Sequence, residues 1–480
     1  MSARQFAFYF DTNRCTGCAA CVIACQIENR DLSDPAAFAL PLWRSIYVQN
    51  PAHLPGGPTY ALSLACQHCA DPACQAACPA AAYCKDAHTG AVTIDPDRCI
   101  GCRYCLWACP YGAPQYDPLH RIAEKCTFCQ HRLQAGEQPA CTGACPTGAL
   151  AFGPHVAPAG TCPDIAGVPR TQLGPAIHFT PLRLTPHPPT PLSPLLADRD
   201  SAREEHALPP GEERGGRGRE VRLANEWPLW LLTTVVPAVF AWFVAGQPGP
   251  WWTDLGFLAA GGLALLLSTA HLGRPLRAWR AVIHWRTSWL SREIILISVL
   301  LVLAAWLCAG RVPFLPRPAT GAVDELVYVL LLAVGSLTLL AIDQVYAVLP
   351  LRFAPRDEIY LPRPRPHSAW ALLSGLYLAG LLAIDAPALA AAGSALAAAG
   401  AAAGLAQLVL YLRQYGRRPA GARNPWRAAL RLGSGVAVPA LLLLGGQPAW
   451  LAFCAALTGA AIDRAEFYAD LQPVRPGVPY

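Results

Sequence analysis

The chain has 480 residues, of which 54% are hydrophobic and only 14% are charged, and its formal net charge is +6. Soluble proteins carry about 25% charged residues, so the composition excludes a chain that is soluble throughout. The basic excess arises after residue 223, where 19 basic side chains accompany 12 acidic ones among long apolar stretches. We therefore attribute the excess to membrane topology and expect no binding of nucleic acid.

Sixteen of the twenty cysteines form four groups of four in the first 145 residues, and three groups end in Cys-Pro. In the bacterial ferredoxin run, three cysteines bind one cluster and the fourth binds its neighbour. The spacing therefore predicts four iron–sulfur clusters that share ligands in pairs. The groups are Cys15, Cys18, Cys21 and Cys25 (group one); Cys66, Cys69, Cys74 and Cys78 (group two); Cys99, Cys102, Cys105 and Cys109 (group three); and Cys126, Cys129, Cys141 and Cys145 (group four).

Two other uses of these cysteines are disfavoured. Structural zinc closes its site with two CxxC pairs and needs no third cysteine three residues further on. A secreted disulfide scaffold would carry an export signal, which the start MSARQFAFYF does not resemble. The four cysteines outside the groups are interpreted as spare thiols or packing residues: Cys84, Cys162, Cys308 and Cys454.

The cysteine region contains an internal repeat. DTNRCTGCAAC at Asp11–Cys21 matches DPDRCIGCRYC at Asp95–Cys105, and each follows a short apolar run, FAFYF or AVTI. This pattern predicts a duplicated bacterial-ferredoxin-like α+β domain over residues 1–183.

Residues 184–223 are rich in proline, glycine and charge and have no apolar period. This composition favours a disordered or extended linker. A docking motif for a partner is the alternative.

Residues 224–480 contain eight apolar segments, each close to the ~20 residues that cross a bilayer. Tryptophans at several starts fit an interfacial belt, so we expect an all-α eight-helix transmembrane bundle. A large buried soluble core is the alternative. The expected spans are Trp227–Ala245, Trp251–Thr269, Trp289–Ala309, Leu326–Leu349, Trp370–Ala388, Leu389–Leu412, Ala428–Leu444 and Trp450–Tyr468.

Arginines are concentrated in the loops after spans two, four and six, whereas the alternate loops carry only Arg311 and Arg317. The positive-inside rule then places the basic loops and the cluster domain on the cytoplasmic side of the bacterial plasma membrane. The basic-loop arginines are Arg274, Arg277, Arg280, Arg286, Arg352, Arg356, Arg363, Arg365, Arg413, Arg417, Arg418, Arg423 and Arg427.

Four ionisable residues within or beside the spans are candidates for function, because such groups are costly in a bilayer. His271 ends span two and Glu293 lies in the first turns of span three, so both can meet at one membrane face. They could bind a quinol and accept its protons; the alternative is a helix cap and a loop ion pair. For Asp343 and Asp463 we expect interfacial solvation. Histidines facing one another on spans are lacking, which disfavours haem.

On these motifs, residues 1–183 resemble the four-cluster electron-transfer subunit of the dimethyl sulfoxide reductase family of molybdopterin oxidoreductases. The resemblance rests on all sixteen cysteines and on CRYCxxACPYG at Cys102–Gly112. The second half resembles that family's eight-helix anchor through HLGRPLRAW at His271–Trp279 and SWLSRE at Ser288–Glu293. The resemblance implies a fusion of two subunits that are usually separate.

The resemblance also implies how the groups combine: group one pairs with group four, and group two with group three. A tryptophan replaces Cys102 in relatives with a three-iron cluster, so its presence here implies four 4Fe-4S clusters. Cys25 departs from the pattern because Gln26, not proline, follows it. The implied ligand sets are Cys15, Cys18, Cys21 with Cys145; Cys126, Cys129, Cys141 with Cys25; Cys66, Cys69, Cys74 with Cys109; and Cys99, Cys102, Cys105 with Cys78.

The expected function follows. His271 and Glu293 match positions that the anchor family uses for menaquinol, and a separate molybdopterin subunit would receive the electrons in anaerobic respiration. The chain has no molybdopterin domain, so we expect no catalysis at the terminal acceptor. Two alternatives are electron flow from a formate- or sulfur-oxidising partner to quinone, and a docking or assembly platform with structural clusters. For the cluster domain, the periplasmic side is the alternative.

Overall fold

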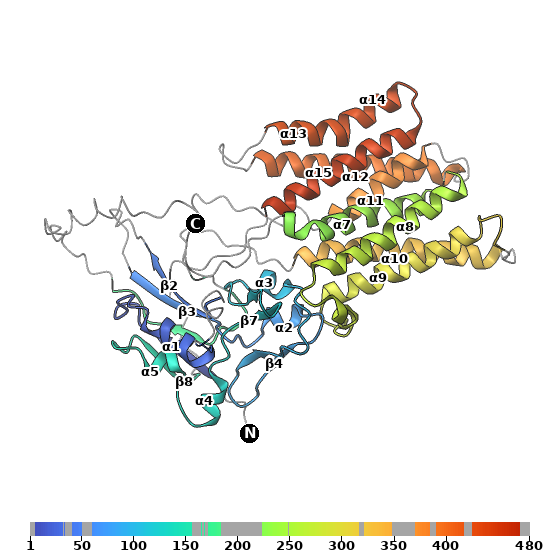
Figure 1. Cartoon of the computed structure of the whole chain (residues 1–480). Helices are drawn as coiled ribbons and strands as arrows, with labels where there is room; N and C mark the ends of the chain where they lie inside the picture. Colours follow the sequence, from blue (N-terminus) through green and yellow to red (C-terminus); the bar gives the residue numbers. More distant parts are fainter. Residues whose placement is uncertain are drawn as a thin grey trace.

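The structure is a computed structural model of the chain, and it describes residues 5–31, 33, 41–49, 60–155, 165, 168, 171–183, 223–247, 249–315, 321–347, 370–384, 390–416 and 425–470. The predicted linker up to residue 222, Cys162, and the basic loop after span four lie outside these residues. Figure 1 shows a cysteine-rich domain of short strands and helices beside a bundle of long helices.

In its described residues the cysteine-rich domain has one three-stranded sheet and three two-stranded antiparallel pairs. In the sheet, the strand order is β8-β1-β9, with β1 antiparallel to β8 and parallel to β9. The antiparallel pairs are β2 with β3, β4 with β5 and β6 with β7. The strands are β1 (Phe6–Phe10), β2 (Arg44–Gln49), β3 (Tyr60–Ala65), β4 (Tyr83–Lys85), β5 (Val92–Ile94), β6 (Gln115–Asp117), β7 (Ile122–Glu124), β8 (Leu150–Pro154) and β9 (Ile177–Phe179).

Short helices carry the cysteines between these strands. Because each helix is only one to three turns long, tertiary packing rather than helix propensity must hold it. The helices are α1 (Ala20–Asn29), α2 (Ala73–Ala77), α3 (Tyr104–Ala108), α4 (Gln130–Gln134) and α5 (Ala140–Gly143).

The sequence repeat is also a structural repeat. In both copies the aspartate that opens the motif accepts a hydrogen bond from the backbone N–H two residues later, at 2.9 Å in Asp11 and 2.8 Å in Asp95. The residue before each helix is left-handed, with φ 61° at Ala19 and 62° at Arg103. This sharp turn brings the CxxC cysteines and the helical cysteine to one side of the loop.

The second half consists of long apolar helices and two short 3-10 segments. Within its described residues, six helical segments are long and apolar enough to cross a membrane, and they correspond to spans one to four, six and seven. The elements are α7 (Leu223–Val244), α8 (Trp251–Ser268), η2 (Thr269–His271), η3 (Pro275–Val282), α9 (Trp289–Ala309), α10 (Gly321–Ala347), α11 (Trp370–Ala383), α12 (Ala390–Gly416), α13 (Pro425–Leu432), the π-helix η7 (Gly433–Ala437), α14 (Val438–Leu444) and α15 (Ala449–Asp470).

The other two predicted spans fall on helices of a different character. Helix α11 is apolar but has 14 residues in the described part of span five. Helix α15 has 22 residues but carries charges, including Asp463 and Arg464, and it is not among the six segments that are apolar enough to cross a membrane. Both pack inside the bundle and contact α7 as well as each other.

Glycines allow two of these helices to approach closely. A Cβ placed on Gly380 of α11 would lie 2.6 Å from the Cα atom of Gly400 in α12. Such small residues let transmembrane helices pack backbone against backbone. The alanine- and glycine-rich sixth span forms a helix of 27 residues and packs closely against α11.

The cysteine-rich domain packs against one end of the bundle, where α2 and α3 meet it (Figure 1). The amides of Gly273 and Arg274 donate to the carbonyl oxygens of Gly101 and Ile100, at 3.3 and 3.1 Å. Ser288 donates its hydroxyl proton to the Ala77 carbonyl oxygen at 2.9 Å. The cysteine-rich domain therefore docks on the loop between α8 and α9.

We expect Gly273→Ala to weaken this docking, because its Cβ would overlap the Arg121 carbonyl oxygen and lie 2.9 Å from the Tyr116 hydroxyl. Overpacking of this kind costs about 1–3 kcal/mol, which corresponds to amide hydrogen exchange roughly 5- to 150-fold faster at Arg274. Gly262→Ala is the matched control, because no atom lies within 4 Å of its added Cβ. Equal exchange in the two variants would contradict the assigned contact.

Candidate functional site

The structure gathers the sixteen cysteines into four sets, each containing three cysteines of one group and one cysteine of another. Within each set, several thiols are close enough to interact electrostatically, such as Cys15 with Cys145 and Cys102 with Cys78. The sets have the composition that the resemblance implies. They are set A (Cys15, Cys18, Cys21, Cys145), set B (Cys25, Cys126, Cys129, Cys141), set C (Cys66, Cys69, Cys74, Cys109) and set D (Cys78, Cys99, Cys102, Cys105).

Two of the sets line cavities. Set A lines one of them together with Phe10 and Leu150. Set C lines the other together with Tyr111 and Leu173. Four convergent thiols around an otherwise apolar hollow suit a metal–sulfur group better than a polar ligand.

Burial keeps these thiols protonated as long as no metal is bound. It raises the pKa of Cys25 and of Cys69 to about 12, so both would keep their protons at neutral pH without a metal. Metal binding displaces such protons and stabilises the fold at the same time. The donor chemistry therefore fits iron–sulfur clusters.

Backbone amides point at the sulfur atoms. Ala82 N–H donates to Cys78 Sγ at 3.4 Å, Ala123 N–H to Cys99 Sγ at 3.5 Å and Leu150 N–H to Cys145 Sγ at 3.4 Å. Such hydrogen bonds favour the thiolate form and help to set the reduction potential of a bound cluster.

Arg44 is a buried cation that no sequence motif predicts. It is 2% exposed, at the start of β2, and interacts electrostatically with Cys21 of set A and Cys25 of set B. Its Nη1 donates to Ser63 Oγ at 3.0 Å. Nothing in the sequence around a single arginine at a strand start indicates this position, which only the folding of β2 against β3 creates.

Arg44→Met is expected to lower the reduction potentials of clusters bound by sets A and B. A reduced cluster carries an additional negative charge that the guanidinium stabilises, and a nearby unit charge in a protein is worth a few kcal/mol. The expected shift is on the order of 50–100 mV, measured by redox titration with electron paramagnetic resonance. Arg44→Lys keeps the charge and should retain most of the potential; superimposable titration curves for Arg44→Met and the native protein would contradict the role.

His271 and Glu293 lie at the face of the bundle that meets the cysteine-rich domain. His271 is half-buried, and its Nδ1 contacts the Ser268 carbonyl oxygen. Glu293 is 3% exposed. His271 and Glu293 both lie in the described part of the chain, and no hydrogen bond joins their side chains there.

Arg103 and Tyr104, which stand between Cys102 and Cys105, reach the two residues instead. Arg103, next to Cys102, donates to the His271 carbonyl oxygen at 3.2 Å and pairs with Glu226 at 3.2 Å. Tyr104 lies within electrostatic range of Glu293, and its hydroxyl donates to the Val345 carbonyl oxygen at 2.8 Å. The loop that carries a set D cysteine therefore touches the bundle between His271 and Glu293.

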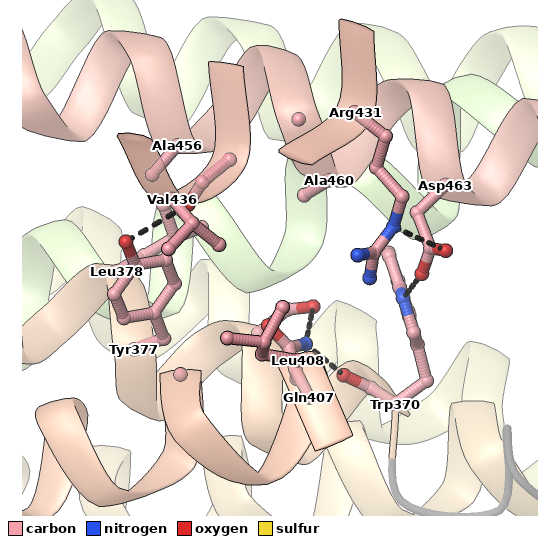
Figure 2. A pocket seen from close by; sticks show the side chains of 14 residues that line it. Trp370, Tyr377, Leu378, Gln407, Leu408, Arg431, Val436, Ala456, Ala460 and Asp463 are labelled. Atoms are coloured by element: carbon pink, nitrogen blue, oxygen red, sulfur yellow. Dashed lines mark hydrogen bonds and ion pairs between the residues drawn. The ribbon is translucent and has the colours of Figure 1, made fainter. Parts of the chain in front are cut away.

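The expectation of interfacial solvation for Asp343 and Asp463 is wrong. Asp343 is 1% exposed, and its carboxylate accepts hydrogen bonds from the backbone amides of Ala371 and Leu372, at 2.9 and 3.3 Å. Asp463 is 5% exposed and accepts from Arg431 Nε at 2.7 Å (Figure 2). Asp343 caps the start of α11, and Asp463 holds a buried ion pair, so both are structural partners inside the bundle.

Three cysteines outside the sets lie in the described part of the chain. Cys84 and Cys454 are exposed and Cys308 is buried. Their interpretation as spare or packing residues stays a prediction.

Comparisons with known proteins cover both halves. The family model described as 4Fe-4S dicluster domain matches residues 59–155, and the model described as DMSO reductase anchor subunit (DmsC) matches residues 254–351. The chain is a multi-pass membrane protein with an iron–sulfur domain, as the sequence predicted.

Several curated relatives match the first half. The probable anaerobic dimethyl sulfoxide reductase chain YnfG of Escherichia coli (strain K12) is 40% identical over 191 residues, which is 37% of this chain and 85% of the relative. A polysulfide reductase subunit of Wolinella succinogenes is 40% identical over 156 residues, 32% of this chain and 77% of its own. The thiosulfate reductase electron transfer subunit PhsB of Salmonella typhi is 38% identical over 152 residues, 31% of this chain and 76% of its own. The protein therefore belongs to the dimethyl sulfoxide reductase family of iron–sulfur electron-transfer subunits, and it carries a DmsC-type anchor in the same polypeptide.

Proposed function

We propose that this chain oxidises menaquinol at the membrane and delivers the electrons to a separate molybdopterin subunit. The observation that carries the proposal is the contact of the Cys102–Tyr104 loop with the bundle beside His271 and Glu293. A quinol at that face would lie next to the thiols of set D.

Each set would hold one 4Fe-4S cluster, four in all. Each bound cluster would carry one electron at a time. The protein contributes the thiolates, the amide donors to sulfur and the burial that excludes water. The sixteen cysteines are accordingly assigned as ligands, and no haem is expected.

His271 and Glu293 would accept the two protons of the quinol. The His271 Nδ1–H donates to the Ser268 carbonyl oxygen, so the neutral ring presents a bare Nε2 as an acceptor. Glu293 offers a carboxylate in an almost water-free position, where it can hydrogen-bond the second hydroxyl group.

Set A would be the exit toward the partner. Cys18 is exposed and Cys15 and Cys145 are partly exposed, whereas three of the four set D thiols are buried and only Cys102 is partly exposed. The relatives are named as subunits of dimethyl sulfoxide, polysulfide and thiosulfate reductases, which favours flow from quinol to a reducible acceptor. Flow in reverse, from a formate- or sulfur-oxidising partner to quinone, is the alternative.

Iron and acid-labile sulfide analysis of the purified chain tests the cluster assignment. We expect about sixteen of each per chain, with no haem absorption band. Values near eight would contradict four clusters. Four intact clusters that exchange no electrons with quinol or quinone would favour a structural docking or assembly platform.

The membrane half would form eight passes, with the cluster domain on the cytoplasmic side. The domain docks on the α8–α9 loop, which is rich in arginine. Because arginine-rich loops favour the cytoplasmic face, this loop supports the cytoplasmic side. Labelling of the exposed Cys84 with a membrane-impermeant maleimide tests it. We expect labelling in inverted vesicles only; labelling in intact spheroplasts would place the domain in the periplasm.

A further inference from the structure

Each of the four cysteine groups has a residue with positive φ immediately before the second cysteine of a CxxC pair. In groups one and three this residue is glycine, with φ 71° at Gly17 and 68° at Gly101. In groups two and four it is His68 or Phe128, with φ 41° and 60°. Only groups two and four therefore carry a ring side chain at this position of the loop.

The His68 and Phe128 rings stack on each other where the loops of set C and set B meet. Their centroids lie 3.6 Å apart with 29° between the ring planes, and both residues are fully buried. The two sets are neighbours here, because Cys66 of set C interacts electrostatically with Cys126 of set B. Electrons that pass from set C to set B would therefore pass beside this stack.

One ring nitrogen of His68 already has a partner. The backbone N–H of Val92 donates to His68 Nδ1 at 2.9 Å, so Nδ1 is a bare acceptor and the ring proton stays on Nε2. Val92 is 1% exposed, so water does not compete for this contact. The stack and this hydrogen bond together fix the orientation of the ring.

The other ring nitrogen, His68 Nε2, is a buried donor. Among the residues that the structure describes, no acceptor lies within hydrogen-bond reach of it. A buried donor without an acceptor is destabilising, and such groups are rare in folded proteins. His68 and Val92 both line the cavity of set C. A cluster held there would present sulfur atoms, which accept hydrogen bonds.

The polar neighbours of the ring leave one other acceptor. Lys125 donates to the carbonyl oxygens of Val92 and Cys126, and an ammonium group cannot accept. Gln67 Oε1 lines the same cavity and is also buried without a hydrogen-bond donor. No hydrogen bond joins it to the His68 ring, so a water held by both groups is the competing outcome of the test.

We propose that His68 Nε2–H donates a hydrogen bond to a sulfur atom of the cluster bound by set C and raises the reduction potential of that cluster. The reduced cluster carries one more negative charge than the oxidised cluster, so the hydrogen bond stabilises the reduced state more strongly. This favours transfer of an electron from a reduced cluster in set D to an oxidised cluster in set C. The inference rests on the proposed function in that it requires a cluster in set C.

Redox titration of the full chain in nanodiscs, followed by electron paramagnetic resonance, tests the proposal. The set C signal is identified by its loss in Cys74→Ser. His68→Phe keeps a ring and removes both nitrogen atoms, and Phe128 shows that phenylalanine fits this backbone conformation. At a fixed potential we expect an about tenfold higher ratio of oxidised to reduced set C cluster, which corresponds to a potential lower by about 59 mV for one electron. His68→Gln keeps an N–H donor and should retain most of the native potential.

His178→Phe is the matched control. His178 is a partly buried histidine of β9 that contacts His155 at 2.9 Å, and it lines neither of the two cysteine cavities. The substitution should leave all cluster potentials unchanged.

A second measurement uses the native side chain. The chain is produced with histidine that carries ¹⁵N in the ring only, and the reduced clusters are examined by pulsed electron paramagnetic resonance. We expect a weak ¹⁵N coupling on the set C signal, which is absent in His68→Phe and present in His178→Phe. If His68→Phe fails to bind the set C cluster, the labelled native chain decides the question.

Three results would overturn the proposal. A native set C potential in His68→Phe, with unchanged iron content, would show that the ring does not act on this cluster. An equal shift in His178→Phe would assign the shift to a general effect of the substitution. A ¹⁵N coupling on the set B signal would place the donor at that cluster, and no coupling on any signal would assign Nε2–H to a water beside Gln67. Iron analysis separates these results from a failure of the proposed function, because a native chain without a set C cluster would contradict that function itself.

Discussion

Cys109→Ser is expected to eliminate the same cluster as Cys74→Ser, although Cys109 belongs to group three and Cys74 to group two. Both thiols lie in set C and interact electrostatically. Cys105→Ser, four residues before Cys109, should instead affect the set D cluster. Electron paramagnetic resonance of the reduced chain, with iron analysis, separates the outcomes: we expect the same signal to vanish in the first two variants, with a loss of about four iron atoms.

The control is Cys84→Ser, because Cys84 is exposed and belongs to no set. It should retain every signal. If Cys109→Ser and Cys105→Ser removed one and the same signal, each sequence group would hold its own cluster, and the crosswise sets would be wrong.

His271→Ala and Glu293→Gln should each lower the rate of quinol oxidation by roughly 10²- to 10⁴-fold, the range lost with a general acid–base group. The first removes the Nε2 acceptor, and the second replaces a carboxylate that accepts a proton with an amide that cannot. Stopped-flow measurement of cluster reduction by a short-chain menaquinol checks this, with all cluster signals retained after chemical reduction.

Glu325→Gln is the matched control, because this exposed glutamate lies in the first turns of α10, at the end of the helix away from Tyr346. It should oxidise quinol at the native rate. Native rates in His271→Ala and Glu293→Gln would refute the assigned site.

The sequence predicted the repeat and most helices because these features are encoded locally. The Asp11 and Asp95 motifs specify the same turn wherever they stand, and apolar spans of about twenty residues need no tertiary information. That Cys109 and Cys74 belong to the same set could be learned only from the fold or from a known relative. The spacing of the cysteines along the chain does not decide which groups share a cluster.

Other features could not be predicted, because tertiary contacts decide them. Asp343 and Asp463 lie near span ends, where a sequence alone suggests solvent, but packing of α11 and α15 buries both and gives each a donor. Arg44 stands in no motif, and its position between sets A and B depends on the β2–β3 hairpin. The loop contact through Arg103 and Tyr104 likewise joins residues more than 160 positions apart.

Quinone in the membrane should exchange electrons with the clusters of this chain. Electron paramagnetic resonance of the full chain in nanodiscs measures this exchange most directly, in samples frozen after addition of menaquinol to the oxidised form or menaquinone to the reduced form. We predict a change in the cluster signals in at least one direction, and its loss in the His271→Ala, Glu293→Gln double variant. Signals that respond to dithionite but to neither menaquinol nor menaquinone would contradict the claim.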